Sequence, residues 1–237
     1  MKWLVLLEDV KKSDFDNLWN LLRSSDEFSL ITENSKYYLT SSRWESLTNE
    51  SDVYCQATKP LQDISDIARI YFIDFPLLKP DIIYEVDQQG KRHGRFALSA
   101  TIRVDSSSFS IQLEGGQDRI PILEFESWMK LAEEDEAVKQ VFRQFRYFEH
   151  KWINLYKVYE IVKKDAGKKD KIEQWITKDK IRQFKHTANS QSAIGDDARH
   201  GVDQNDPPKE PMAESEAEAL IRNLVKQWLQ WKCEQQK

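Results

Sequence analysis

The spacing of apolar residues changes once along this chain, close to Pro121. Before Gly115-Gly116, apolar residues alternate with others, which is typical of a sheet with one buried face. After Pro121 they recur every three or four residues, which is typical of amphipathic helices. The sequence therefore predicts an α+β protein. An N-terminal α/β and β-sheet region would cover 1–118, with a further break near residue 70 left open, and an all-helical region would cover 119–237.

The first seventy residues predict a small α/β module. Short apolar runs indicate strands, and the Asn34-Ser35 pair is a turn signal between two of them. Helices are indicated where apolar residues recur at helical spacing, and Asp14 is a candidate N-cap. The expected elements are strand Trp3–Leu7, a helix after Asp14, strands Phe28–Thr32 and Lys36–Thr40, and helix Leu61–Ile70.

The next part of the chain predicts four strands rich in aromatic and branched residues. Turns that contain Pro, Asp, Gly and Ser separate them, and Lys91-Arg92-His93 is expected in one of the turns. The expected strands are Tyr71–Phe75, Ile82–Val86, Phe96–Val104 and Phe109–Leu113.

The C-terminal part predicts helices only. One long amphipathic helix is expected from Val138 to Val162, and Thr177 is a candidate cap for a later helix. Ser215 and Glu218 fit a capping box that would open the last helix.

A polar segment at 184–201 carries the strongest functional signal. It contains His186, Asn189, Arg199 and His200, and also the Asp196-Asp197 pair. Arg binds phosphate with two donors, and His moves protons near neutral pH, so Arg199, His200 and His186 are candidate catalytic residues. A structural interpretation competes: the His side chains would bond the loop backbone, the Asp pair would hold Arg199, and Asn189 would end its helix in the left-handed conformation.

Charge points to the same part of the chain. Residues 139–185 hold 14 Lys and Arg against 6 Asp and Glu, although the whole chain has a net charge of −5. Such a basic run indicates either a nucleic-acid-facing region or a solvated helix face. Arg182, Lys185 and Asn189 are therefore candidate nucleic-acid contacts.

Other classes of site find no support in the sequence. The two Cys are far apart, the Asp residues do not follow the calcium-loop pattern, and no glycine-rich phosphate loop is present. We therefore expect no metal and no cofactor. No signal peptide or membrane span is evident at the sequence level, so a cytoplasmic location without membrane contact is expected.

The helical part, Glu126–Lys237, resembles the HEPN superfamily. The resemblance rests on Trp152-Ile153-Asn154-Leu155-Tyr156, on Arg199-His200-Gly201, and on a closing helix that contains Trp228-Leu229. It implies a helical, often dimeric domain that cleaves RNA without metal or binds nucleotides, often in toxin–antitoxin or antiviral defence systems. The Arg and His here are adjacent, whereas the family separates them by a short spacer.

Two functional hypotheses follow. The first is an RNA-binding effector or metal-independent endoribonuclease of such a system. The second is a non-catalytic interaction or sensor module whose β part recognises a partner. Under both, a homodimer or hetero-complex through the C-terminal helices is expected.

Overall fold

The computed structural model describes residues 2–7, 9–23, 25–87, 89, 91–96, 122–146, 151–167, 169–203 and 205–236. The chain forms two compact units. Unit 1 comprises Met1–Ser65 and Phe75–Phe125, and unit 2 comprises Asp66–Asp74 and Glu126–Lys237. The predicted boundary between 118 and 119 lies outside the described residues.

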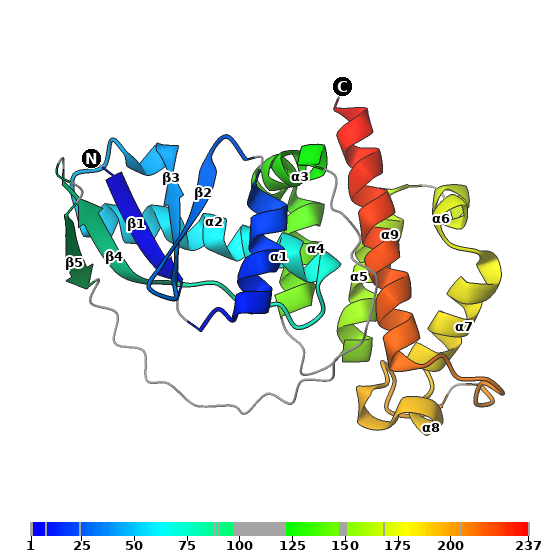
Figure 1. Cartoon of the computed structure of the whole chain (residues 1–237). Coiled ribbons are helices and arrows are strands. Elements are labelled where there is room, and N and C mark those ends of the chain that lie inside the picture. The colour runs from blue at the N-terminus through cyan, green and yellow to red at the C-terminus, as the bar shows by residue number, and fades with distance from the viewer. Residues whose placement is uncertain are drawn as a thin grey trace. The chain divides into compact units, whose positions relative to one another are not determined.

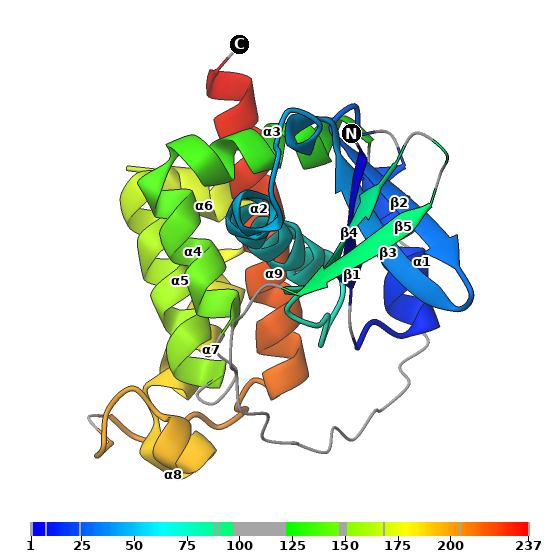
Figure 2. The same ribbon diagram turned by 90° about the vertical axis from the view of Figure 1, so that its left-hand side faces the viewer.

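Unit 1 is built on a five-stranded antiparallel sheet with the order β2-β3-β1-β4-β5 (Figure 1). Unit 1 also contains helix α1 and the first part of helix α2, which runs alongside the sheet in both ribbon views (Figures 1 and 2). The elements are β1 Lys2–Leu7, α1 Lys12–Leu22, β2 Phe28–Glu33, β3 Lys36–Ser41, the 3-10 turn η1 Ser42–Trp44, α2 Glu50–Tyr71, β4 Pro80–Val86 and β5 Arg92–Phe96.

The strand register places apolar residues on both faces of this sheet. Val5 pairs with Leu39 and Ile83, so these three buried side chains share one face. Leu4, Leu6 and Tyr38 form a cluster on the other face. The β2–β3 connection is the predicted tight turn: Asn34 and Ser35 have φ of 50° and 59°. Two successive positive φ angles are the mark of a type I′ hairpin, which matches the twist of the strands.

Unit 2 is helical. Its long helices α5 and α9 lie side by side (Figures 1 and 2). Apolar residues of α9 such as Ile221, Leu224 and Trp228 are completely buried. The elements are α3 Ile122–Glu134, α4 Glu136–Arg146, α5 Lys151–Asp165, α6 Lys169–Trp175, α7 Lys178–Ala188, α8 Gln191–Ile194, the 3-10 turn η2 Gly195–Asp197 and α9 Glu214–Gln235. The α+β class is therefore confirmed for the described residues.

The predicted long helix is two helices. α4 and α5 pack against each other instead of continuing in one line (Figure 2). Phe142 in α4 and Tyr159 in α5 are both buried, and the apolar spacing keeps the same helical period on both sides of the break. Periodicity alone therefore did not reveal the break. His150 lies outside the described residues.

The helix predicted at Leu61–Ile70 begins at Glu50 instead. Pro60 lies inside it, where the missing N–H removes one helical hydrogen bond. The buried series nevertheless runs through Pro60, because Val53, Ala57 and Leu61 are all fully buried.

The strand predicted at Tyr71–Phe75 is wrong. Tyr71 is the last residue of α2, and its ring stacks on Trp128 with centroids 5.4 Å apart. The aromatic residue that suggested a strand thus packs between helices.

Smaller differences concern a turn and two helix starts. His93 lies in β5, not in a turn, and its Nε2 lies 3.1 Å from a carboxylate oxygen of Asp87. Asp14 is the third residue of α1, not its N-cap, and its side chain accepts a hydrogen bond from the N–H of the N-cap residue Lys11, as the acidic member of a capping box does. Ser215 lies inside α9, which begins at Glu214. The strand predicted at Phe109–Leu113 lies outside the described residues, as does Phe96–Val104 except for Phe96.

None of the described helices combines the length and apolar character needed to cross a membrane.

Candidate nucleic-acid interface

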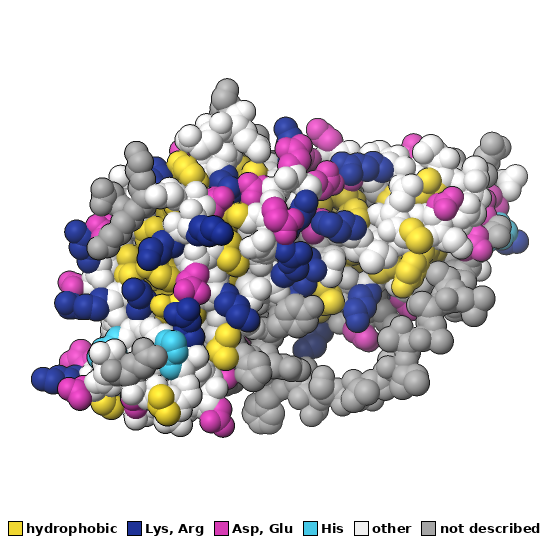
Figure 3. Space-filling model, turned by 180° about the vertical axis from the view of Figure 1, so that it is seen from behind, with side chains coloured by type: hydrophobic (Ala, Val, Ile, Leu, Met, Phe, Trp, Pro, Cys, Tyr) yellow, Lys and Arg dark blue, Asp and Glu magenta, His cyan; other side chains and the backbone are white. Residues whose placement is uncertain are grey.

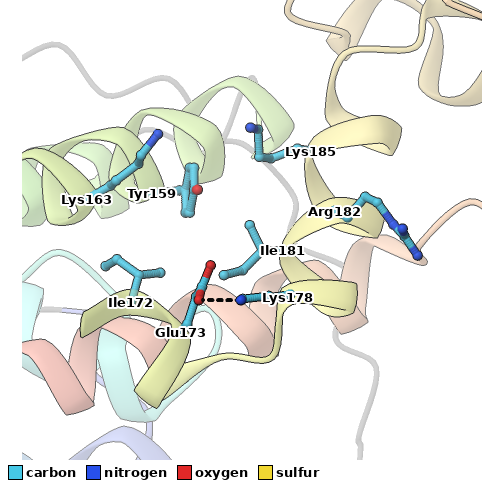
Figure 4. Close-up of a pocket in the computed structure, with 8 residues that line it drawn as sticks. All are labelled: Tyr159, Lys163, Ile172, Glu173, Lys178, Ile181, Arg182 and Lys185. Atoms are coloured by element: carbon cyan, nitrogen blue, oxygen red, sulfur yellow. Dashed lines mark ion pairs between the residues drawn. The ribbon is translucent and has the colours of Figure 1, made fainter. Parts of the chain in front are cut away.

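A cavity of about 280 Å³ opens between α5, α6 and α7 of unit 2. Its size is close to the lower end of small-molecule sites. Its lining residues all come from these three helices (Figure 4). They are Tyr159, Lys163, Ile172, Glu173, Lys178, Ile181, Arg182 and Lys185, and we refer to this site as the basic cavity.

An aromatic cluster holds the walls of the basic cavity in place. Phe184 of α7 is buried, and its ring stacks on Trp152 and Tyr156 of α5 with centroid distances of 6.0 Å. Tyr159 meets Phe184 edge to face at 6.0 Å. These contacts fix α7 against α5, so the basic residues on both helices are presented from a rigid frame.

The inner surface of the basic cavity is apolar. Ile172, Ile181 and the ring of Tyr159 point into it (Figure 4). Burial raises the pKa of the Tyr159 hydroxyl, and the nearby Tyr156, Glu160 and Glu173 add to that shift. The phenol therefore stays neutral at physiological pH, and its O–H is available to donate a hydrogen bond.

The rim of the cavity is cationic. Four of its residues carry positive charge and only Glu173 carries negative charge. Lys178 pairs with Glu173 at 3.1 Å, and Arg182 points away from the cavity and pairs with Asp179 at 3.1 Å (Figure 4). Within the part of the chain that the structure describes, Lys163 and Lys185 have no carboxylate partner. Figure 3 shows Lys and Arg side chains gathered on this side of the helical unit.

A second, more open hollow of about 300 Å³ lies on the other side of Arg182. His186 and Lys209 are among its lining residues. The Nε2 atom of His186 lies 2.8 Å from the carbonyl oxygen of Asp206, and the Gln183 side chain donates to the carbonyl of Glu210 at 3.2 Å. His186 is thus bonded to the backbone of the connection between η2 and α9.

Arg199 is held against α5. Its guanidinium carbon lies 4.6 Å from the centroid of the Tyr156 ring, and Nη2 lies 3.2 Å from a carboxylate oxygen of Glu160. Its backbone N–H donates to the carbonyl of Ala188 at 3.0 Å. These three contacts tie the polar segment to α5 and to the end of α7.

Further hydrogen bonds join residues of the polar segment to each other and to Asp203, which follows it. Asp203 accepts hydrogen bonds from the hydroxyl groups of Ser190 and Ser192, and these, led by Ser192, lower the pKa of its carboxyl. Asn189 ends α7 with φ −100° and ψ −1°, so the predicted left-handed conformation is wrong. Its side-chain amide donates to the carbonyl of Lys185 at 2.7 Å.

The structure brings together some of the predicted site residues. Arg182 and Lys185 line the basic cavity, and Arg182 and His186 line the second hollow. Arg199 and His200 line neither of these two cavities. Lys163, Lys178 and Tyr159 were missed as individual site residues, although the basic run at 139–185 contains all three.

The described residues contain no group of three or more His, Cys, Asp or Glu side chains placed to hold a metal ion. None of the family models, curated proteins or solved structures compared with the chain matches it.

Proposed function

We propose that the helical unit binds single-stranded RNA at the basic cavity. The observation that carries this proposal is the pair Lys163 and Lys185, whose ammonium groups have no carboxylate partner among the described residues and lie at the rim of an apolar cavity. Proteins that bind single strands combine cations for the backbone phosphates with apolar or aromatic surface for the bases. The choice of RNA over DNA rests on the resemblance to the HEPN superfamily.

The contacts of the polar segment favour binding over cleavage. The guanidinium of Arg199 is engaged by Tyr156 and Glu160, and the imidazole of His186 by the Asp206 carbonyl. A catalytic Arg and His need free donors directed at one phosphate. Tight local bonding of this kind is what a structural loop requires.

Charge reversal tests the proposal. We expect Lys163→Glu and Lys185→Glu each to weaken the binding of fluorescein-labelled poly(U) RNA about tenfold in anisotropy titrations, with a shallower salt dependence. Lys157→Glu is the matched control, because Lys157 is exposed on the same helix and does not line the cavity. If all three variants lose RNA affinity equally, the loss reflects only the change in net charge, and the proposal that RNA binds at the basic cavity is wrong.

The same protein tests cleavage. The protein is incubated with the RNA in the presence of a metal chelator, and the RNA is then separated by electrophoresis. If the protein binds RNA without cleaving it, the RNA stays intact. Degradation that disappears in His186→Ala or His200→Ala would instead establish a metal-independent ribonuclease. A titration with labelled poly(dT) compares the affinity for single-stranded DNA with the affinity for RNA, and we expect the affinity for RNA to be higher.

Association through the C-terminal helices is also part of the proposal. Light scattering of the purified chain across a range of concentrations tests for a homodimer.

A further inference from the structure

The outer edge of β2 in unit 1 has hydrogen-bonding groups that the fold does not use. β2 is the first strand in the sheet order, with a neighbour on one side only among the described strands (Figure 1). Its register with β3 pairs Ser29 with Thr40, Ile31 with Tyr38 and Glu33 with Lys36. In an antiparallel ladder that closes on a two-residue turn, these pairs exchange the hydrogen bonds.

The intervening residues therefore direct their backbone groups outward. The N–H of Phe28 donates to the Ser25 hydroxyl at 3.1 Å, which agrees with that direction. Within the described chain, the N–H groups of Leu30 and Thr32 have no acceptor. They lie two residues apart, the spacing at which another strand presents its carbonyl groups.

A small cavity opens beside this edge. It measures about 110 Å³, room for one side chain, and lies between the end of α1 and the start of β2. Trp19 forms one wall and is 49% exposed, although it is a large aromatic residue. The lining residues are Trp19, Leu22, Arg23, Ser25, Phe28, Ser29 and Leu30.

We propose that the β2 edge binds an extended peptide of a partner protein, which adds a strand to the sheet and places an apolar side chain against Trp19. Backbone pairing supplies affinity, and a side-chain pocket supplies selectivity in this mode of recognition. Arg23 is exposed at the cavity and has no carboxylate partner among the described residues. The peptide therefore carries an acidic residue next to the apolar one.

Charge argues against a second copy of β2 as the occupant. Two copies of β2 could pair antiparallel with Leu30 of one strand opposite Leu30 of the other. This register would use the outward backbone groups of both strands, and the cavity at Trp19 in each copy would lie beside the added strand. That register places Glu27 directly opposite Glu33 of the second copy, at both ends of the pairing. Like charges directly opposite each other destabilise a sheet. Arg43 and Arg92 pair with these two carboxylates and weaken the repulsion. The register also needs the Phe28 N–H, which already donates to the Ser25 hydroxyl.

The test begins with a phage-displayed library of random short peptides selected on the full-length chain. Enriched peptides should alternate apolar and polar residues and carry Asp or Glu. A fluorescein-labelled peptide of the enriched sequence then measures affinity by anisotropy.

Two variants probe the two parts of the site. Thr32→Pro removes an outward N–H without touching the ladder to β3, and proline is tolerated on edge strands. Trp19→Ala removes the cavity wall. Each should weaken peptide binding about tenfold or more. Thr32→Val is the matched control, because it keeps the N–H, and its affinity should equal that of the wild type.

Three outcomes would overturn the proposal. They are the absence of any enriched peptide, wild-type affinity in Thr32→Pro, and a homodimer seen by light scattering that Thr32→Pro dissociates. Circular dichroism melts establish that each variant folds, and the two substitutions lie on different elements, so one misfolded variant leaves the other as a test. RNA binding by the same variants should be unchanged, which keeps this site separate from the basic cavity.

Discussion

At the scale of single residues, Lys232 joins three parts of the helical unit. Its ammonium lies 2.7 Å from carboxylate oxygens of both Asp135, between α3 and α4, and Asp165, at the end of α5. The indole N–H of Trp228 donates to Asp165 at 2.8 Å. Because the Lys232 side chain is only 12% exposed, its two ion pairs are poorly screened by solvent.

Replacing Lys232 should therefore destabilise unit 2. Lys232→Met leaves two carboxylates close together without their shared cation, and we expect a loss of about 2 kcal/mol in the free energy of unfolding. Urea denaturation followed by circular dichroism measures it. Arg143→Met, which breaks a largely exposed pair with Glu136, is the control and should cost less than about 0.5 kcal/mol. Similar values for both variants would contradict this role of Lys232.

The ion pair between Lys232 and Asp135 also predicts that the stability of the protein depends on pH. Burial alone would raise the pKa of the Asp135 carboxyl, but hydrogen bonds from Lys232 and Val138 and the Lys232 charge outweigh it and lower the pKa below 3.8. A carboxyl with a lowered pKa stabilises the fold above its unfolded pKa, and this contribution is lost as pH falls through the folded value. Denaturation curves between pH 5 and about 2 should show a smaller loss of stability in Lys232→Met than in the wild type.

Arg199 provides a contrasting residue-level test. Its contacts with Tyr156 and Glu160 are partly exposed, so Arg199→Ala should cost only about 1 kcal/mol of stability. RNA affinity of the folded variant should stay at the wild-type value. A thermal melt and an anisotropy titration on one preparation measure stability and RNA affinity. A loss of affinity without a loss of stability would mean that Arg199 contacts the RNA.

At the scale of elements, α2 contains a proline that its interior position disfavours. Pro60 lies inside the helix. In such a position proline removes one helical hydrogen bond, and its ring crowds the carbonyl one turn earlier. We expect Pro60→Ala to raise the free energy of unfolding by about 1–2 kcal/mol, after the added freedom of the unfolded chain is subtracted. Gln56→Ala, on the exposed side of the same helix, should change it by less than about 0.5 kcal/mol. A destabilised Pro60→Ala variant would mean that the ring packs favourably.

The elements also show what periodicity can and cannot predict. Strand Trp3–Leu7 and the Asn34-Ser35 hairpin were predictable, because apolar runs and turn residues are local signals. The break between α4 and α5 and the extension of α2 beyond Pro60 were not, because the apolar phase continues across both. In the candidate site, the basic run indicated the right helices. The partners of Arg199 and His186 depend on contacts with residues distant in sequence, Glu160 and Asp206, that no local pattern encodes.

At the scale of the whole molecule, residues 66–74 belong to the helical unit although they precede the rest of it in sequence. Asp66 is fully buried, and both its carboxylate oxygens accept hydrogen bonds from Nε of Arg146 at 2.9 Å. Removing the charge of a buried ion pair is costly, so Asp66→Asn should lower stability by about 3 kcal/mol or more. Asp179→Asn, at an exposed pair, is the control. A fragment of residues 119–237 lacks Asp66 altogether and should melt well below unit 2 in the intact chain.

The shared helix α2 also sets an order of events during synthesis. The ribosome releases Tyr71 long before α9, yet the ammonium of Lys226 in α9 lies 4.5 Å from the centroid of the Tyr71 ring. Ile67, Ala68 and Ile70, which are fully buried in the finished protein, likewise emerge before the helices of unit 2. Because the helices of unit 2 are translated later, these side chains stay exposed to solvent until most of the chain has been made. The nascent chain thus passes through a stage in which an apolar helix end is open to chaperones and to aggregation.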